Sequence, residues 1–358
     1  MNSAAEKQPL APYPAARVLV AGASGYAGAL AAELAWLHPH LELVRVTART
    51  DAGKTLNELY PRYRVPLVLE EPSEESAEGI DAAIVAYPHG AAAPVVAAFR
   101  RADVKVVDLS ADFRLHDLET YGRWYGEHGA PELLNEAVYG LTELHRERIA
   151  GAGLVANPGC YPTASLLALA PLAEASLIED VVIDAKSGVS GAGRAAAEEM
   201  QAVKDGDNTR PYKVAGHRHT PEIAQELAEL AGTSINRVAP DGAPSHNALT
   251  FVPHLLPFHQ GELVSCYVRT SEPLDAARLL ELYEARFAAE PFVELSVDPP
   301  GVSGVRETNL CRIHVALDEP SGRVMSFAAI DNLWKGAASQ AIQNLNLMLA
   351  LPEGEGIS

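Results

Sequence analysis

The chain has 358 residues and a formal net charge of −19, from 47 acidic and 28 basic residues. This charge argues against general electrostatic binding of nucleic acid or an anionic membrane surface. No apolar run approaches the roughly 20 residues of a membrane span. With 48% hydrophobic and 21% charged residues, the composition is typical of a globular enzyme, and the length predicts two domains.

The cysteines and the N-terminal residues indicate the cellular setting. Three cysteines (Cys160, Cys266 and Cys311) are too few and too scattered for a disulfide framework or a zinc site. A reducing, cytoplasmic compartment is the simplest interpretation. Residues 1–16 mix prolines, alanines and charged side chains without an apolar segment, so we expect a disordered leader and not a secretory signal.

The first predicted elements are a strand at 17–21, a glycine-rich turn, a helix ending at Leu37 and a strand at 41–46. The turn has the spacing G-x-x-G-x-x-G, a variant of the dinucleotide-binding fingerprint. Its glycines allow a tight turn and close approach of the backbone to a pyrophosphate. An ordinary glycine-rich turn is the alternative. The expected cofactor contacts are Gly22, Ser24, Gly25, Tyr26 and Gly28.

The end of the second strand indicates which dinucleotide binds. NAD sites usually place an acidic side chain there, against the ribose hydroxyls. This chain has a hydroxyl at Thr47 and a guanidinium at Arg49 instead. Both suit a 2′-phosphate, so NADP(H) is favoured over NAD. The alternative for Arg49 is an exposed, solvated side chain.

Strands predicted at 82–86, 104–108 and 154–156 alternate with helical stretches, which indicates a doubly wound parallel sheet. The loop from Asp108 to Arg114 leaves the end of one of these strands, where ligands bind in such folds. Ser110 and Arg114 have the donors to hold a phosphate there. Pairing of Asp112 with Arg114 is the alternative.

Cys160 lies between a short strand and the apolar helical pattern at 164–170. A thiol at the start of a helix faces unpaired backbone N–H groups and the positive end of the helix dipole, which favour the thiolate. Most cysteines outside disulfides are small buried hydrophobes. The segment by itself therefore leaves both a nucleophile and a core residue open.

After this helix the strands become longer and alternate in polarity, which predicts a second α+β domain with a largely antiparallel sheet. These strands are expected at 181–185, 248–252, 261–268 and 310–315, and a last helix at 335–346 is expected to return to the first domain.

His217, Arg218 and His219 combine two imidazoles with a guanidinium, a set suited to acid–base chemistry on an anion. Local capping is the alternative for at least one histidine. Histidines two residues apart without a third ligand argue against a metal site. The Ser/Gly loop from Ser187 to Arg194 is expected to wrap substrate or cofactor, or to be a mobile connection.

The motifs together closely resemble the N-acetyl-γ-glutamyl-phosphate reductases, relatives of the aspartate-semialdehyde dehydrogenases. The matching segments occur in the family's order and span nearly the whole chain apart from the leader. They are GASGYAG from Gly22, YPHG from Tyr87, DLSADFRL from Asp108, NPGCYPT from Asn157, SGVSGAGR from Ser187, GHRHTPEI from Gly216 and DNLWKGAASQA from Asp331. The resemblance implies a Rossmann-type NADP domain at 17–159, completed by a helix within 331–350, and a catalytic and oligomerisation α+β domain at 160–330.

The resemblance also implies the reaction: reduction of N-acetyl-glutamyl 5-phosphate by NADPH to N-acetyl-glutamate 5-semialdehyde and phosphate, in arginine biosynthesis. Cys160 is implied to attack this small anionic acyl phosphate and form a thioacyl-enzyme, which hydride then reduces. His217 is implied as acid/base, with His219 as the fallback, and Arg114 as the holder of the leaving phosphate. A homo-oligomer, dimer or tetramer, and no metal are expected.

Two sets of contacts complete the predicted site. Because the chain is strongly acidic, an anionic substrate needs placed basic residues, and we assign its carboxylate to Arg194 or Arg218. Further cofactor contacts are expected from Pro88, His89, Ser187, Gly188 and Asn332.

Three alternatives remain beside this interpretation. An acyl-phosphate reductase of lysine biosynthesis uses the same motifs on an aminoadipate derivative attached to a carrier protein. Aspartate-semialdehyde dehydrogenases are less well matched, because their cysteine typically follows asparagine directly, whereas Pro158 and Gly159 intervene here. A catalytically idle NADP-binding sensor is disfavoured by the presence of Cys160, His217 and Arg114.

Overall fold

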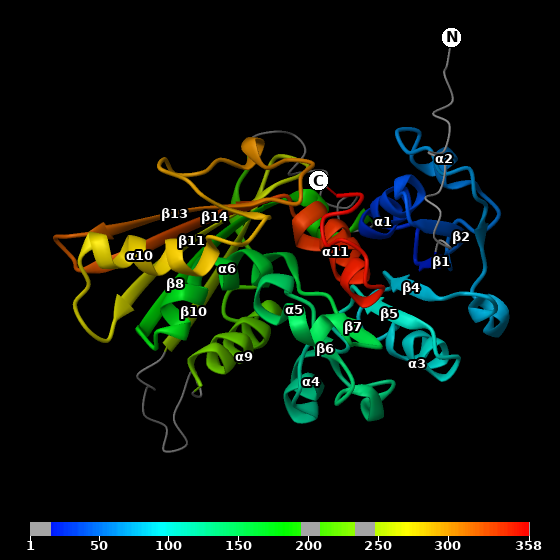
Figure 1. Ribbon diagram of the computed structural model, residues 1–358, viewed down its shortest axis with the longest axis horizontal. Coiled ribbons are helices and arrows are strands. Elements are labelled where there is room, and N and C mark those ends of the chain that lie inside the picture. The colour runs from blue at the N-terminus through cyan, green and yellow to red at the C-terminus, as the bar shows by residue number, and fades with distance from the viewer. Residues whose placement is uncertain (1–15, 195–207, 233–247, 358) are drawn as a thin grey trace, which may run out of the picture. The chain divides into compact units, whose positions relative to one another are not determined.

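The computed structural model describes residues 16–194, 208–232 and 248–357, which form two compact units (Figure 1). The first unit consists of the chain up to Pro158 together with the residues from Ala337 onward. The second unit is Gly159–Gly336. The leader expected at 1–16 lies outside the described residues except for Ala16, which begins the first strand.

The first unit is built on a seven-stranded parallel sheet in the order β3-β2-β1-β4-β5-β7-β6. Its central strands are short and almost wholly apolar because helices cover both faces of such sheets. The strand order reverses between β1 and β4, and this switch point is where open α/β sheets bind ligands. The strands are β1 (Ala16–Ala21), β2 (Leu41–Thr47), β3 (Leu69–Glu70), β4 (Ala82–Val85), β5 (Lys105–Asp108), β6 (Val138–Tyr139) and β7 (Leu154–Ala156).

The C-terminal helix packs in the first unit, against α1, α5 and β5. Buried amide side chains hold it there. The amides of Gln340 and Asn344 donate to the carbonyl oxygen of Gly140 at 3.1 and 2.8 Å. The helices of this unit are α1 (Tyr26–Leu37), α2 (Leu56–Leu59), α3 (Ala93–Arg101), α4 (Leu118–Tyr125), α5 (Thr142–Ala150) and α11 (Ser339–Met348).

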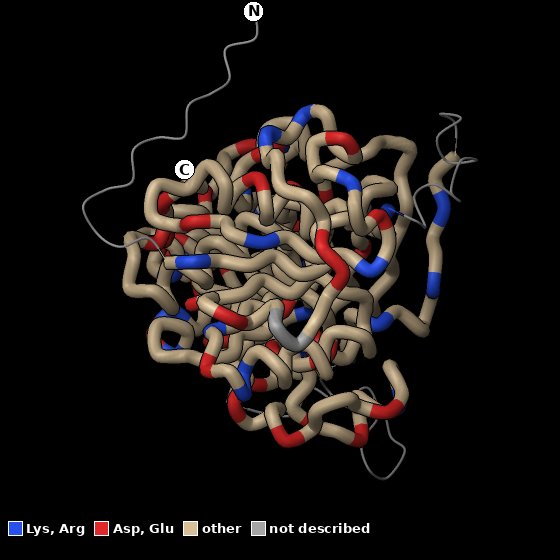
Figure 2. The backbone as a smooth tube through the Cα atoms, turned by 90° about the vertical axis from the view of Figure 1, so that its right-hand side faces the viewer, with Lys and Arg blue, Asp and Glu red and all other residues tan. Residues whose placement is uncertain are grey.

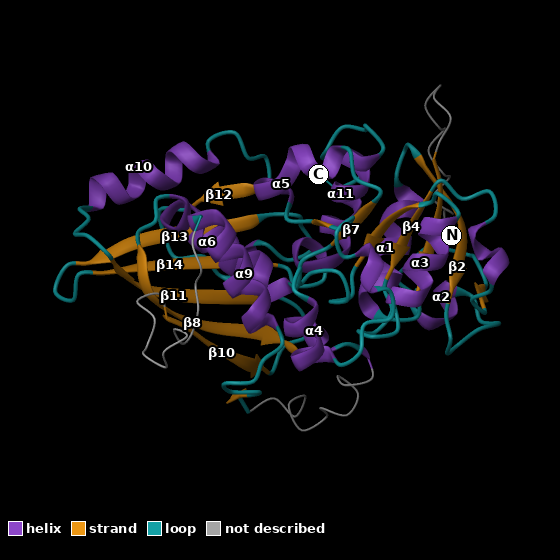
Figure 3. Cartoon of the chain, turned by 90° about the horizontal axis from the view of Figure 1, so that it is seen from below, coloured by secondary structure: helices purple, strands orange, loops and turns teal. Residues whose placement is uncertain are grey.

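The second unit contains a seven-stranded mixed sheet in the order β12-β13-β14-β11-β8-β10-β9 (Figure 3). Most neighbours are antiparallel, as expected, but β10 pairs with β8, and β12 with β13, in parallel. The strands are β8 (Ile178–Gly188), β9 (Arg210–Pro211), β10 (Ala248–Leu256), β11 (Glu262–Thr270), β12 (Val293–Leu295), β13 (Cys311–Asp318) and β14 (Arg323–Ile330).

Helices α6 (Cys160–Glu174), α9 (His219–Ala231) and α10 (Ala276–Phe287) cover this second sheet. Residues 161–173 of α6 are buried on all sides, since the helix packs against the sheet and against both α9 and α10. Tyr283 and Ser326 both donate to the carbonyl oxygen of Ala168, at 2.6 and 2.9 Å, and so fix α6 against α10 and β14. These hydrogen bonds fix the position of α6, and with it the first turn of the helix, within the second unit.

Acidic and basic residues are interspersed along the backbone in the view of Figure 2. Among the described residues, no helix combines the length and the apolar character needed to cross a bilayer.

Candidate active site

The glycine-rich loop between β1 and α1 has the geometry of a dinucleotide-binding turn. Gly22 has a φ of +85°, and a Cβ there would lie 2.6 Å from the carbonyl oxygen of Ala86. A Cβ on Gly28 would overlap the carbonyl oxygen of Gly22, so α1 packs directly on the turn. At Gly25 the nearest atom would be 3.7 Å away. No packing among the described residues requires Gly25, so its missing side chain leaves space for a ligand.

The start of α1 offers donors to that space. Gly25 is the N-cap of α1, and no side chain caps the helix there. Its first N–H groups are suited to a pyrophosphate. Tyr60, which lies in no predicted motif, donates its hydroxyl to the carbonyl of Ser24 at 2.8 Å and packs edge-on against Tyr26. Tyr60 therefore holds the loop from outside the glycine motif.

Thr47 and Arg49 meet Tyr87 at the ends of β2 and β4. The hydroxyls of Thr47 and Tyr87 are 3.1 Å apart, and the exposed Arg49 guanidinium lies 5.2 Å from the centre of the Tyr87 ring. A guanidinium over an aromatic face is held by a cation–π interaction. Arg49 is thus placed beside the switch point between β1 and β4.

The loop after β5 is organised around a buried carboxyl group. Asp108 accepts hydrogen bonds from the Ser110 backbone at 3.0 Å and from its hydroxyl at 2.6 Å. Burial raises the pKa of Asp108 to about 7. The Ser110 oxygen in turn accepts from the N–H of Asp112 at 3.0 Å. The Ser110 hydroxyl therefore shapes this turn, and its contact to a phosphate stays a prediction.

Arg114 is buried and reaches the segment before the cysteine. Its Nε donates to the carbonyl of Asn157 at 2.8 Å and its Nη2 to that of Leu109 at 2.7 Å. Asn157 also accepts from Asn344 of α11 at 3.0 Å. These bonds fix Asn157, which directly follows β7 and lies three residues before Cys160. Phosphate binding by Arg114 remains a prediction.

Pro88 and His89 form the turn after β4. The carbonyl of Pro88 accepts from the N–H of Ala91 at 3.0 Å, and Nδ1 of His89 accepts from the N–H of Ala111 at 2.9 Å. Because Nδ1 is an acceptor, the neutral ring carries its proton on Nε2. His89 thereby ties the β4 turn to the β5 loop.

Cys160 is the first residue of α6 and is half-buried, whereas Cys266 and Cys311 are fully buried. Gly159 is the N-cap, without a side-chain cap, and its N–H donates to the carboxylate of Glu222 at 2.8 Å. Gly336 packs closely against the cysteine: a Cβ on Gly336 would lie 2.8 Å from that of Cys160. The thiol is therefore the accessible one of the three and stands at a helix N-terminus.

His217 is enclosed by aromatic rings. The rings of Tyr161, Tyr212, Phe251 and His219 lie 5.7, 5.5, 5.3 and 4.8 Å from it, centre to centre. Burial lowers the pKa of His217 to about 4, with smaller effects from nearby positive charges. Its Nδ1 accepts from the backbone N–H of His219 at 3.2 Å. The ring is therefore neutral near pH 7 and presents Nε2–H as a donor.

The other predicted basic residues lie at the ends of elements. Arg218 is the exposed N-cap residue of α9, and His219 is the first residue of that helix, 5.8 Å from the Tyr161 ring. Arg194 is half-buried and immediately precedes residues that the structure does not describe. Their substrate contacts remain predictions.

Ser187, Gly188 and Asn332 occupy one junction of the second sheet. The Ser187 hydroxyl donates to the carbonyl of Gly188 at 3.1 Å. Asn332 accepts from the N–H of Gly261 at 2.7 Å and donates to the Ser190 hydroxyl at 3.0 Å. Asn332 thus joins the segment after β14 to the turn before β11 and to Ser190 after β8. Cofactor contacts from these residues remain predictions.

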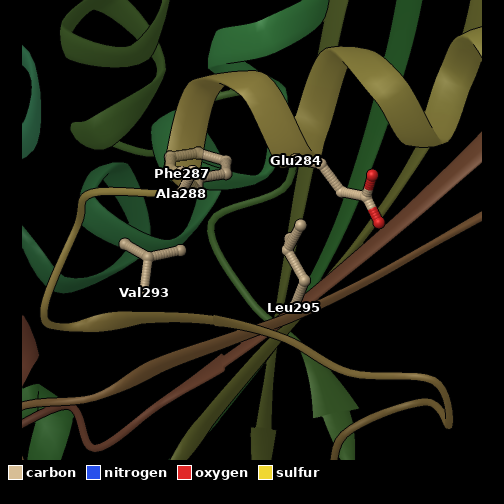
Figure 4. A pocket seen from close by; sticks show the side chains of 5 residues that line it. All are labelled: Glu284, Phe287, Ala288, Val293 and Leu295. Atoms are coloured by element: carbon tan, nitrogen blue, oxygen red, sulfur yellow. The ribbon is translucent and has the colours of Figure 1, made fainter.

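A separate cavity of about 270 Å³ lies beside the end of α10 (Figure 4). It is lined by Glu284, Phe287, Ala288, Val293 and Leu295, none of which is a predicted site residue.

Comparison with known proteins decides the family. Residues 17–152 match the semialdehyde dehydrogenase NAD binding domain, and residues 160–332 match the semialdehyde dehydrogenase dimerisation domain. A curated relative from Geobacter sp. (strain M21), named N-acetyl-gamma-glutamyl-phosphate reductase, is 44% identical over 349 residues, 95% of this chain and 97% of that protein. The chain belongs to the N-acetyl-γ-glutamyl-phosphate reductase family.

A relative of the same name from Moorella thermoacetica is 44% identical over 344 residues, 93% of this chain and 95% of its own. Among solved structures, aspartate semialdehyde dehydrogenase II from Vibrio cholerae shares the fold, with a TM-score of 0.71, 18% identity and coverage of 94% of this chain and 99% of that one. The family and the fold class expected from the motifs are confirmed. The chain is accordingly an oxidoreductase with a nicotinamide cofactor domain.

Proposed function

We propose that this reductase converts N-acetyl-glutamyl 5-phosphate and NADPH to N-acetyl-glutamate 5-semialdehyde, phosphate and NADP, as a cytoplasmic step of arginine biosynthesis. The observation that carries the proposal is the half-buried Cys160 thiol at the uncapped start of α6, in a chain 44% identical to reductases of that name. A reducing compartment is supported by three cysteines without a disulfide.

The cofactor site fits NADPH. The open space at Gly25 and the first N–H groups of α1 suit the pyrophosphate, and Arg49, held over Tyr87, suits the 2′-phosphate. When bound, NADPH supplies the hydride.

Cys160 supplies the nucleophile. The helix dipole and unpaired N–H groups at the start of α6 stabilise its thiolate. The sulfur attacks the acyl carbon, the bond from that carbon to the phosphate oxygen breaks, and a thioester forms on Cys160. Hydride transfer to this carbon gives an oxyanion, whose collapse breaks the C–S bond, releases the aldehyde and restores the thiolate. The thioester presents hydride with a more reactive carbonyl than a carboxylate.

His217 serves the oxyanion in this scheme. With its pKa lowered to about 4 by burial, it is a weak base near pH 7. Its Nδ1 already accepts from the backbone of His219, so Nε2–H is the group it offers to a developing negative charge. His219 is the fallback for this role.

Arginines supply the substrate contacts. Arg114 is held beside the segment leading into Cys160 and is proposed to bind the leaving phosphate. Arg194 or Arg218 is proposed to bind the substrate carboxylate. Replacing both Arg194 and Arg218 by glutamine should raise the substrate KM, and an unchanged KM would show that neither binds it.

The assay runs the reaction in reverse, from N-acetyl-glutamate 5-semialdehyde, phosphate and NADP, following NADPH absorbance. Wild type should form NADPH, Cys160→Ala should not, and Cys311→Ala, which alters a buried cysteine, should retain activity. No activity in wild type, or full activity in Cys160→Ala, contradicts the proposal. If the enzyme turned over a carrier-bound aminoadipate semialdehyde and not N-acetyl-glutamate 5-semialdehyde, the chain would be assigned to lysine biosynthesis.

A second copy of the chain is the proposed partner, in a dimer or tetramer. The face of the second sheet opposite the core-facing row carries half-buried Tyr267, Met325 and Phe327, and the matched domain is described as a dimerisation domain. A charge at Phe327, as in Phe327→Asp, should lower the mass measured by sedimentation. An unchanged mass would place the interface elsewhere.

A further inference from the structure

Glu262 occupies an apolar position in the second sheet. β11 turns alternate side chains toward α6, and Val264, Cys266 and Val268 in this row are all fully buried. Glu262 begins the same row and is also 0% exposed. A carboxyl group in such a row loses its hydration at a considerable free-energy cost. Buried ionisable groups of this kind are often retained for function.

The side chain that faces this carboxyl group is the Cys160 thiol. Among the described residues, neither carboxyl oxygen of Glu262 has a hydrogen-bond partner. The Cys160 side chain lies close enough to lower the pKa of the carboxyl group. β11 and α6 contact each other because α6 packs against the face of the sheet that includes β11 and β14.

The register of the sheet brings the two groups together. Glu262 lies opposite Ile330 of β14. A Cβ on Gly336 would lie 3.3 Å from Cδ1 of Ile330 and 2.8 Å from Cβ of Cys160. Gly336 therefore allows the first residue of α6 to approach the end of β14, beside Glu262.

The surroundings disfavour a second negative charge. Burial raises the pKa of Glu262 to about 8, the Cys160 side chain opposes that rise, and the charge of Asp331 adds to it. Tyr161 of α6 and Tyr212, which follows β9, also feel both Glu262 and Cys160, and their pKa values are raised, chiefly by burial. These facing groups are thiol, carboxyl or phenol, and none of them is a base that could pair with an anion.

We propose that Glu262 is a positioning residue for Cys160, with its carboxyl group and the thiol sharing one proton and one negative charge between them. In the reactive form the S–H bond is broken, the proton is on the Glu262 oxygen, and that O–H donates to the thiolate. In the other form the carboxylate accepts from the intact S–H group and holds the thiol back. The inference rests on the proposed role of Cys160 as the nucleophile.

The test follows thiolate formation directly. The rate at which iodoacetamide alkylates Cys160 in the full chain, read by peptide mass spectrometry, is measured against pH without substrate. Two groups that share a proton ionise in two steps when they interact by more than about one pH unit. Wild type should show two steps. Glu262→Gln, which keeps the shape and a donor, should show one step with a midpoint between them.

A matched control separates this role from burial of a carboxyl group in general. Glu33, in α1, is also buried, and its pKa is also raised by burial. Glu33→Gln should leave both steps in place. A single step in wild type, or a Glu262→Gln profile that superimposes on that of wild type, overturns the inference. The wild-type profile decides alone if Glu262→Gln fails to fold.

The outcome is distinguishable from failure of the proposed function. Loss of reductase activity in Cys160→Ala together with a single alkylation step refutes the role of Glu262 and leaves the nucleophile in place. Full activity in Cys160→Ala removes the nucleophile whatever the alkylation profile shows. If Glu262 were merely structural, its substitution would change the unfolding midpoint without altering the number of steps.

Discussion

Two glycines of the loop between β1 and α1 lack a side chain for different reasons, so their replacement should have different effects. Gly28 is required by packing within the loop, whereas Gly25 leaves space for a ligand. A Cβ on Gly28 would overlap the carbonyl oxygen of Gly22 and lie 3.0 Å from its carbonyl carbon. The backbone must move to admit it. Overpacking of this kind costs about 1–3 kcal/mol. Gly28→Ala should therefore lower the free energy of unfolding by about 1–3 kcal/mol.

Gly25→Ala should behave differently. Its Cβ would meet its nearest atom at 3.7 Å, and its backbone, at φ −83° and ψ 163°, is one that alanine adopts readily. The smaller entropy of the unfolded chain stabilises the variant by about 0.4–1 kcal/mol, whereas alanine is a markedly worse N-cap than glycine and costs a similar amount. These effects nearly cancel, so stability should change by less than about 0.5 kcal/mol.

The methyl group of Gly25→Ala would instead enter the space left for the pyrophosphate. We expect NADPH to bind at least about tenfold more weakly, a loss of about 1.4 kcal/mol. Urea unfolding and NADPH fluorescence titration measure the two quantities. A Gly25→Ala variant that is as unstable as Gly28→Ala, or that binds NADPH like wild type, would contradict these different roles of the two glycines.

Three further predictions concern packing, cofactor choice and pH. Gly336→Ala places a Cβ 2.8 Å from that of Cys160, so the free energy of unfolding should fall by about 1–3 kcal/mol; an unchanged urea curve would contradict this packing. Arg49→Leu removes a charged contact worth about 1.5–3 kcal/mol, so NADPH affinity should fall far more than NADH affinity, and equal losses would show that Arg49 does not read the 2′-phosphate. His217 has a pKa of about 4 in the folded chain, against the ordinary histidine value of 6.5, so the unfolded chain binds an extra proton at pH values between these two. The free energy of unfolding should therefore rise with pH across this window, by on the order of 3 kcal/mol, and a His217→Gln variant with the same slope would exclude this cause.

The first unit was largely predictable from sequence because its signals are local. Glycine spacing, short apolar strands and intervening helices set the order of a parallel sheet once right-handed crossovers are assumed. The parallel pairing of β10 with β8 in the second unit was not predicted, since contacts between distant strands decide it. The helix start expected at Cys160 is confirmed, and Pro162 fits there because proline is tolerated in the first turn of a helix.

The candidate site was predictable in its residue types and less so in their contacts. The sequence marks Arg114 and Asn332 as polar groups near strand ends, but folding brings backbone and hydroxyl partners to them. Glu262 was missed because a polar residue at the start of an alternating strand usually faces solvent. Its burial depends on the packing of α6 and β14, which no local pattern reveals.

The central claim is that Cys160 carries the acyl group. The direct measurement is mass spectrometry of the full chain mixed with N-acetyl-glutamyl 5-phosphate in the absence of NADPH, followed by peptide mapping. The account predicts an N-acetyl-glutamyl group on the peptide containing Cys160, lost when NADPH is added and absent from Cys160→Ala. An unmodified Cys160 in a preparation that turns over with NADPH, or the same adduct on Cys160→Ala, would contradict it.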